Sequence, residues 1–300
     1  MENIKKITLK APAKINLYLG VVSRRADGYH DIESVMQTID LCDRVSVSVC
    51  ENAQEARICV ICRAMPELPA EKNIAYRAAL AFLHYNGIEK YDITIEIDKK
   101  IPSEAGLGGG SSDAAATLRA LDTLYGTKMS AEALYGLGKS VGADVPFLLR
   151  RGTALVEGIG ERMSDCTPAP FATVLVAYPK TEKVSTKEAY GKIDSENAFS
   201  PHADFEKMKE AMKSCDINSI CRAARNIFED VLPKDSAVFA IKDVMNKHGA
   251  ALSLMSGSGS AVFGIFTDTR AAKNAREALS DSCETFISGM FTRDESYIEN

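Results

Sequence analysis

The chain has 300 residues, 46% of them hydrophobic and 26% charged, which is typical of a globular protein with an ordinary buried core and is long enough for two domains. Its formal net charge of -5 and its pI near 5.6 argue against a protein that coats nucleic acid or binds a membrane surface, because such binding needs clustered positive charge. The sequence shows neither the apolar stretch of a signal peptide behind its N-terminal charges nor a run of ~20 apolar residues that could span a membrane. We therefore expect a cytoplasmic protein that binds neither nucleic acid nor a membrane.

The N-terminal part of the chain predicts strands and one helix. Residues 5–22 alternate like strands that are interrupted at residues 11–12, where alanine is followed by proline. Residues 44–51 and 91–101 have the two-residue period of strands that bury one face. The pattern over residues 74–87 predicts a helix, and its last residue is a glycine, which commonly ends helices.

Eight cysteines are spread along the chain at spacings that predict no disulfide framework. Cys59 and Cys62 form a C-x-x-C pair, but they lie in residues 56–63, which have the composition of a strand. Residues three apart on a strand face opposite sides, so this pair cannot share a metal ion without a turn. We therefore expect buried thiols rather than a zinc or redox site.

Residues 101–117 are the most informative segment of the chain. Four glycines fall within five positions, Gly106 and Gly108 to Gly110, and a helix is expected from about residue 112 to residue 125. Because glycine has no Cβ, backbone N–H groups can converge there on a bulky anion. The positive end of the following helix adds to that attraction. The segment therefore predicts a cradle for a phosphate group.

The familiar phosphate-binding motifs do not match this segment. A Walker-type loop that ends at residues 138–140 would need a glycine at position 133, which is alanine. The dinucleotide fingerprint fails as well, since the last glycine would fall on Ser111 or, from Gly158, on Met163. No protein-kinase signature is present. A glycine-rich turn between a strand and a helix, with no ligand, is the structural alternative.

After this segment, helices and strands alternate irregularly. The expected helices cover about residues 130–142, 204–213, 216–228, 236–248 and 269–280, and the expected strands cover residues 151–160, 171–179, 251–266 (with a glycine loop between two strands) and 285–291. Several strands look exposed on one face, which favours an α+β fold over a doubly wound parallel sheet. Glycines and prolines between residues 155 and 170 mark a break, so we expect two domains, residues 1–160 and residues 161–300.

Three further segments carry polar residues in unusual settings. Lys14 lies in a nearly uncharged strand pattern, apolar residues follow Asp144, and Asp27, Tyr29 and His30 share one turn. A single charged residue is usually solvated, but a charge among apolar neighbours needs a partner, because burial of an unpaired charge is unfavourable. We expect Lys14 and Asp144 to satisfy one another across a cleft.

Five segments together resemble the small-molecule kinases of the GHMP superfamily, in the same order along the chain. They are APAKINL (11–17), RADGYH (25–30), GLGGGSS (106–112), GADVP (142–146) and SGSG (256–259). The resemblance covers about residues 10–266. It implies a two-domain α+β protein with a ribosomal-protein-S5-like N-terminal domain and a ferredoxin-like C-terminal domain. A substrate cleft between the domains would follow.

The resemblance also implies roles for individual residues in transfer of a phosphoryl group from ATP, with Mg²⁺. Asp144 would take the proton of the acceptor hydroxyl, and Lys14 would stabilise the charge that develops near the transferred group. Asn73 would lie near the adenine, and Lys99 lies on the strand that leads into the loop. The loop that wraps the ATP phosphates would consist of Pro102, Ser103, Glu104, Ala105, Gly106, Leu107, Gly108, Gly109, Gly110, Ser111 and Ser112. A serine hydroxyl would help to hold Mg²⁺, whose other ligands the sequence does not identify.

The implied acceptor is a small molecule, a cytidine-diphosphate sugar alcohol of isoprenoid precursor synthesis. Asn16 would bond its hydroxyls, and Tyr29, His30 and Tyr190, with Thr186 nearby, would hold the cytosine between aromatic planes. Two positions depart from the family pattern. Met36 stands where an aromatic residue is common, and Glu104 stands where a small residue is common. A methionine gives the pocket a softer wall than an aromatic residue, and a carboxylate beside a triphosphate is unfavourable unless it points away.

Two other functions compete with this interpretation. One is a kinase of the same superfamily that acts on a small alcohol such as mevalonate or homoserine, which would need no pocket for a nucleotide base. The other is a non-catalytic module that uses the S5-like fold to bind RNA or to sense nucleotides. The acidic pI argues against RNA, and the presence of both Lys14 and Asp144 argues against a module without catalysis.

Overall fold

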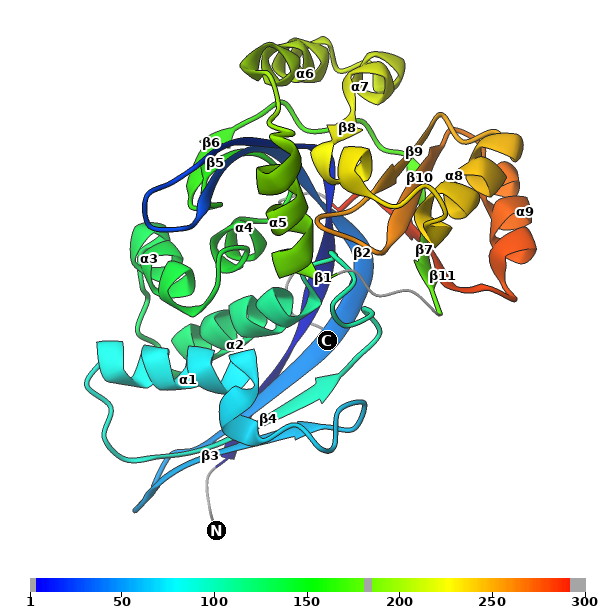
Figure 1. The fold of residues 1–300 in the computed structure, drawn as a ribbon. Coiled ribbons are helices and arrows are strands. Elements are labelled where there is room, and N and C mark those ends of the chain that lie inside the picture. The colour runs from blue at the N-terminus through cyan, green and yellow to red at the C-terminus, as the bar shows by residue number, and fades with distance from the viewer. Residues whose placement is uncertain (1–3, 181–184, 292–300) are drawn as a thin grey trace.

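Two long antiparallel strands run through the computed structural model, which describes residues 4–180 and 185–291. They are β1 (Ile4–Arg24) and β2 (His30–Cys50), each of 21 residues, and they form a hairpin (Figure 1). The predicted interruption of the first strand is wrong, because β1 is continuous and its register with β2 shifts between Pro12 and Ala13. Proline lacks a backbone donor, so the ladder adjusts with a bulge there and then continues.

The first half of β2 was not predicted because it is buried on both faces and so lacks the alternation of a half-buried strand. Its length lets β2 serve two neighbours. Residues 44–49 pair with β4 (Tyr91–Asp98), and residues 32–37 pair with β5 (Thr153–Gly158).

Within residues 4–180 and 185–291, the first sheet has seven strands. Its main order is β3-β4-β2-β1-β8, with β5 on β2 and β6 on β5. The added strands are β3 (Ala56–Cys62), which is parallel to β4, β6 (Arg162–Asp165), and β8 (Arg225–Asn226), which is parallel to β1. The predicted boundary between residues 160 and 161 stays a prediction, and the first sheet takes strands from both sides of it.

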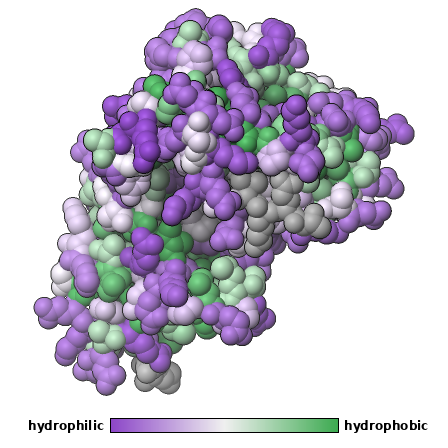
Figure 2. All heavy atoms as spheres, viewed as in Figure 1, coloured by the Kyte–Doolittle hydropathy of each residue, from purple (hydrophilic) through white to green (hydrophobic). Residues whose placement is uncertain are grey.

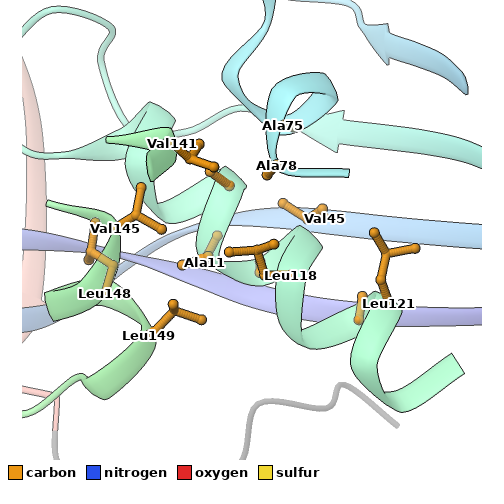
Figure 3. Close-up of a cluster of buried hydrophobic side chains, with 14 of the residues drawn as sticks. Ala11, Val45, Ala75, Ala78, Leu118, Leu121, Val141, Val145, Leu148 and Leu149 are labelled. Carbon is orange, nitrogen blue, oxygen red and sulfur yellow. The ribbon is translucent and has the colours of Figure 1, made fainter. Parts of the chain in front are cut away.

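The helices α1 (Ile74–Tyr85) and α2 (Gly109–Tyr125) contact this sheet, and α3 (Ala131–Val141) and α4 (Val145–Arg150) pack against α2. A short 3₁₀ turn, η1 (Ala70–Lys72), precedes α1. Figure 3 shows Val45 of the sheet facing Ala78 of α1 and Leu118 of α2, all in one cluster of buried side chains. Small alanine side chains let α2 lie close to its neighbours. The helix α4 was not predicted because it has six residues, too few for a helical period.

The second sheet has the order β11-β7-β10-β9, and each pair of neighbours is antiparallel. Its strands are β7 (Thr173–Pro179), β9 (Leu252–Met255), β10 (Val262–Phe266) and β11 (Cys283–Gly289). In chain order these are the first to fourth strands, so the spatial order 4-1-3-2 is that of a ferredoxin-like βαββαβ unit. The helices α8 (Ala237–Lys247) and α9 (Thr269–Leu279) contact this sheet (Figure 1). The predicted α+β class is confirmed.

The helices between β7 and β9 depart most from the predictions. The chain forms α5 (Thr186–Glu196), α6 (His202–Ser214), α7 (Ile217–Ala223) and the 3₁₀ helix η2 (Ile227–Val231). The predicted helix over residues 216–228 is wrong beyond Ala223, because Ala224 is extended and the next two residues join the first sheet as β8. Pairing with β1 replaces the helical hydrogen bonds there.

The cysteines are free thiols, and Cys59 and Cys62 lie on β3 as expected. Their predicted burial is wrong for most of them, since Cys283 is buried, Cys215 is exposed and the other six are half-buried. Among residues 4–180 and 185–291, no group of three or more His, Cys, Asp or Glu side chains is arranged to hold a metal ion. None of the helices in these ranges is long and apolar enough to cross a membrane. Hydrophilic residues cover most of the coloured surface in Figure 2, and apolar residues form small groups between them.

Candidate active site

A cleft of about 1190 Å³ lies between the hairpin of β1 and β2, the glycine-rich loop before α2, and helix α5. Its walls therefore come from both halves of the chain. The predicted site residues that line it are Lys14, Asn16, Tyr29, His30, Glu104, Gly106, Gly108, Ser111, Asp144, Thr186 and Tyr190. The predicted site residues outside its lining are Asn73, Lys99, Pro102, Ser103, Ala105, Leu107, Gly109, Gly110 and Ser112.

Lys14 and Asp144 face each other in this cleft, as the sequence predicts. Lys14 lies on β1 and Asp144 directly precedes α4, and Lys14 Nζ is 4.0 Å from Asp144 Oδ2. Lys14 is 4% exposed, so burial lowers the pKa of its ammonium group from the usual value, while the Asp144 carboxylate opposes that shift. The ammonium group and the carboxylate, a cation and a proton acceptor, therefore line the same part of the cleft.

Asn16 holds the lysine from the same strand. Its Oδ1 accepts hydrogen bonds from Lys14 Nζ at 2.8 Å and from the backbone N–H of Gly257 at 3.0 Å. Its Nδ2 donates to the Ser34 hydroxyl at 2.9 Å, and that hydroxyl donates to the Tyr18 carbonyl. The side-chain oxygen of Asn16 is thus engaged by two hydrogen bonds within the protein. One amide hydrogen is left for the predicted contact with a substrate hydroxyl.

The glycine-rich loop leads into α2 three residues earlier than expected. Gly108 precedes the helix in the left-handed conformation, with φ of 70°, so Gly109 and Gly110 lie in its first turn. Their N–H groups belong to the helix N-terminus, where no intrahelical acceptor exists. The backbone N–H of Lys14 donates to the Leu107 carbonyl at 2.9 Å, which ties the loop to β1.

The two serines of the loop have different environments. The Ser112 hydroxyl is buried and donates to the Pro12 carbonyl at 2.8 Å. Ser111 lines the cleft instead. If one serine of this pair contacts a ligand, the geometry favours Ser111.

The side chains of Lys99 and Asn73 form hydrogen bonds within the protein. Lys99 Nζ bonds the buried carboxylates of Asp43 and Asp113, at 2.8 Å from Asp113 Oδ2. Asp43 also accepts from the backbone N–H groups of Lys100 and Ile101. This cluster attaches the start of the glycine-rich loop to the sheet and to α2. Asn73 caps α1, since its Oδ1 accepts from the N–H of Ala75 at 2.9 Å.

The predicted aromatic residues lie in the part of the cleft lining that comes from the β1–β2 hairpin and α5. His30 and Tyr190 stack on each other, with ring centroids 4.6 Å apart and planes at 28°. Tyr190 and Phe228 form a T-shaped pair, with ring centroids 4.9 Å apart. Burial, helped by the Asp144 carboxylate, raises the pKa of Tyr190 to about 12. Tyr29, in the hairpin turn, is 62% exposed.

Helix α5 is attached to the β1–β2 hairpin and to the loop between β9 and β10. His30 Nε2 shares a 2.8 Å hydrogen bond with Asp194 Oδ1, and Arg24 pairs with the same carboxylate at 3.3 Å. Thr186 Oγ1 shares a 2.8 Å hydrogen bond with Ser258 Oγ. Asp194 and Phe228 were not predicted as site residues, because neither lies in a recognisable motif and both approach the cleft through long-range packing.

Two family models and several curated relatives match the chain. The model of the GHMP kinases N-terminal domain matches residues 73–152, and the model of the GHMP kinases C-terminal domain matches residues 204–285. The chain is 42% identical over 274 residues to the 4-diphosphocytidyl-2-C-methyl-D-erythritol kinase of Caldicellulosiruptor saccharolyticus, covering 90% of this chain and 92% of that protein. It is 39% identical over 282 residues to the enzyme of the same name from Listeria monocytogenes, covering 93% of each.

Solved structures extend the likeness to the fold. A crystal structure of 4-(cytidine 5'-diphospho)-2C-methyl-D-erythritol kinase aligns with a TM-score of 0.78 and 32% identity, covering 95% of this chain and 99% of that chain. A homoserine kinase from Cytophaga hutchinsonii aligns with a TM-score of 0.74 at 22% identity, covering 96% of this chain and 95% of that chain. At that identity the second likeness concerns the fold alone.

Proposed function

The chain belongs to the GHMP kinase family, and we propose that it transfers the γ-phosphoryl group of ATP to a hydroxyl of 4-diphosphocytidyl-2-C-methyl-D-erythritol. The observation that carries the proposal is the placement of Lys14 and Asp144, 4.0 Å apart, in a cleft that also contains the glycine-rich loop and the stacked His30 and Tyr190. The likeness to relatives with that name, over at least 90% of the chain, supports the choice of acceptor. A cytoplasmic location and the absence of nucleic-acid partners stay predictions.

The glycine-rich loop fits a triphosphate. It places the N-terminus of a 17-residue helix at the cleft, with N–H groups of the first turn available to phosphate oxygens. Left-handed glycines let the backbone approach closely. Glu104, which also lines the cleft, makes a contact of its own. We assign the ATP phosphates to this loop.

The residues present also fit Mg²⁺ that is held mainly by the ATP phosphates. Magnesium in kinases commonly uses few protein ligands and keeps several waters. The Ser111 hydroxyl lines the cleft and is the side chain that we assign to the ion. Bound there, Mg²⁺ would neutralise phosphate charge during transfer.

The chemistry then divides between two side chains. Asp144 Oδ2 accepts the proton of the acceptor hydroxyl while the oxygen of that hydroxyl attacks the γ-phosphorus of ATP. The bond between the γ-phosphorus and the leaving ADP breaks in the same step. The Lys14 ammonium, held by Asn16 and beside Asp144, stabilises the negative charge on the transferred group. In phosphoryl transfer, positioning and charge stabilisation of this kind supply most of the rate enhancement.

The stacked pair of His30 and Tyr190 provides the flat surface for the cytosine ring. A base that lies on this pair, with the exposed Tyr29 ring free to cover it, would gain stacking energy of roughly 1–3 kcal/mol. The sugar-alcohol end of the same molecule would then point along the cleft toward Asp144, whose carboxylate lies near Tyr190. A smaller acceptor without a base would leave the stacked rings of His30 and Tyr190 without a ligand.

The test is a coupled ADP-release assay with three acceptors: 4-diphosphocytidyl-2-C-methyl-D-erythritol, mevalonate and homoserine. We expect ATP-dependent turnover of the first, and weak or absent turnover of the others. Preferred turnover of mevalonate or homoserine would contradict the proposed acceptor while leaving the kinase activity intact.

A further inference from the structure

Asn226 lies outside the predicted site and is almost completely buried, at 1% exposure. Its Nδ2 donates to two backbone carbonyls, Met255 at 2.7 Å and Gly257 at 2.8 Å. Its Oδ1 accepts from the backbone N–H of Phe228 at 3.1 Å. Each end of the amide is therefore engaged with backbone, which is typical of a residue that holds a loop in one conformation.

The loop that Asn226 holds connects β9 to β10 and contains residues 256–259, called here the second glycine loop. Gly257 has a φ of 59°, and a Cβ at this position would lie 3.0 Å from the Gly106 carbonyl oxygen and 3.2 Å from Lys14 Nζ. The Ser256 hydroxyl donates to the same Gly106 carbonyl at 2.9 Å. The second glycine loop therefore packs directly against the phosphate-binding loop and the lysine.

The backbone N–H of Gly257 helps to orient the Asn16 amide that bonds Lys14. It donates to Asn16 Oδ1, the same oxygen that accepts from Lys14 Nζ. If the Asn16 amide were flipped, its NH₂ group would face these two donors and its oxygen would face Ser34. The N–H of Gly257 thus favours the orientation in which Lys14 keeps an uncharged acceptor at 2.8 Å.

Asn226 and Asn16 lie on neighbouring strands of the first sheet. β8 carries Asn226 and is parallel to β1, with Asn226 opposite Leu19, while β1 carries Lys14 and Asn16. The second glycine loop is fixed between them. Small displacements of the loop would therefore be transmitted to the Asn16 oxygen.

We propose that Asn226 is a positioning residue for phosphoryl transfer: it holds the second glycine loop so that the Gly257 N–H orients Asn16, and Asn16 in turn fixes the ammonium group of Lys14. The proposal rests on the role of Lys14 in the proposed function. Through this contact, a residue of the C-terminal half of the chain influences the chemical step. The second glycine loop then has the role of orienting Asn16.

The test is Asn226→Asp, which keeps the shape but replaces two N–H donors by an oxygen that faces carbonyl oxygens. Since misplacement of a catalytic group by about 1 Å can lower the rate roughly 10²-fold, we expect kcat to fall by roughly ten- to a hundredfold. The KM for ATP should change little. The alkaline limb of the kcat–pH profile should move to lower pH, because an ammonium group that loses an acceptor is deprotonated more easily.

The matched control is Asn246→Asp. The Asn246 Oδ1 accepts from the Ser253 hydroxyl, a contact that a carboxylate preserves, so kcat and the pH profile should stay those of the wild type. Asn226→Ser, which keeps one donor, is the second variant if Asn226→Asp does not fold. We expect it to show the same shift with a smaller loss of kcat.

The outcomes separate this proposal from the one on which it rests. Wild-type kcat and an unmoved alkaline limb in a folded Asn226 variant, together with an inactive Lys14→Met variant, would overturn the positioning role alone. An active Lys14→Met variant would overturn the role of the lysine. Loss of folding in both Asn226 variants, with thermal unfolding as the readout, would make Asn226 a structural residue and contradict the proposal.

Discussion

Lys14 Nζ and Asp144 Oδ2 lie 4.0 Å apart on two separately built walls of one cleft. Lys14 is supplied by a buried strand and Asp144 by the residue before a short helix. The lysine is nearly inaccessible, while the side chain of the aspartate is 31% exposed. A molecule that enters the cleft therefore reaches the Asp144 carboxylate more easily than the Lys14 ammonium group.

The first prediction concerns Asp144→Asn. The amide has the same shape but cannot take a proton, so kcat should fall by roughly 10²–10⁴-fold, the usual contribution of a general base. ATP binding, measured by calorimetry, should be unchanged. Asp243→Asn, at an exposed position of α8, is the control and should retain wild-type activity. Turnover within about tenfold of the wild type, below the contribution of a general base, would remove Asp144 from that role.

Local sequence patterns were sufficient to pick out the glycine-rich segment and the two charged residues that line the cleft. The glycine-rich segment can be recognised because four glycines in five positions have few other uses. Lys14 and Asp144 stand out because charged side chains among apolar neighbours need a partner. These features depend on residues close in sequence, and the structure brings the two charged side chains together as expected.

The parts that could not be predicted depend on contacts between distant segments. Helix α5 has few apolar residues and buries Ala189 and Ile193, so its sequence carries little helical period. Asp194 on that helix meets His30, which is 164 residues away in the chain. The two residues of β8 are a strand because β1 is beside them. No local pattern contains that information.

The second prediction compares two glycines with similar backbone conformations. Gly106 has a φ of 78° and Gly126 a φ of 65°, so alanine is strained at either position. A Cβ on Gly106 would lie 2.0 Å from the Ser256 carbonyl oxygen, whereas one on Gly126 would meet no atom of the described residues within 4 Å. Gly106→Ala must therefore move the glycine-rich loop away from the second glycine loop.

We expect Gly126→Ala to lower the free energy of unfolding by about 1–2 kcal/mol and to leave kinetics unchanged. Gly106→Ala should lower stability further and should also lower kcat/KM for ATP. Denaturant unfolding and steady-state kinetics on both variants measure these effects. Equal kinetics in the two variants would contradict the close packing of the loops as a requirement for ATP binding.

The third prediction concerns Tyr190→Ala. Loss of a stacking surface that supplies roughly 1–3 kcal/mol per base should raise the KM of the cytidine-containing acceptor by about ten- to a hundredfold. The KM for ATP should change little, because the rings that Tyr190 contacts are those of His30 and Phe228 and not residues of the glycine-rich loop. Tyr190→Phe keeps the ring and should behave like the wild type. Tyr85→Ala, at an exposed position on α1, serves as the control. Equal losses for ATP and acceptor would show that Tyr190 supports the fold rather than the base.

The last prediction concerns the pH dependence of stability at the buried cluster of Lys99, Asp43 and Asp113. Burial raises the pKa of Asp113 to about 8, opposed by Lys99 and assisted by Asp43. An aspartate in the unfolded chain has a pKa of about 3.9. Between about pH 4 and pH 8 the folded protein therefore holds a proton that the unfolded chain has lost.

Because the folded state binds more protons in this window, the contribution of Asp113 to the free energy of unfolding falls as pH rises, by at most about 1.4 kcal/mol per pH unit. The asparagine of Asp113→Asn cannot ionise, and its side-chain oxygen can still accept a hydrogen bond from Lys99. The free energy of unfolding of this variant therefore does not show the fall with pH that Asp113 causes in the wild type. Its stability relative to the wild type should increase steadily from pH 5 to pH 8 in urea unfolding experiments. The exposed Asp243→Asn variant should follow the wild-type curve. If Asp113→Asn runs parallel to the wild type as well, the carboxyl group is ionised throughout, and Lys99 then compensates both buried carboxylates on its own.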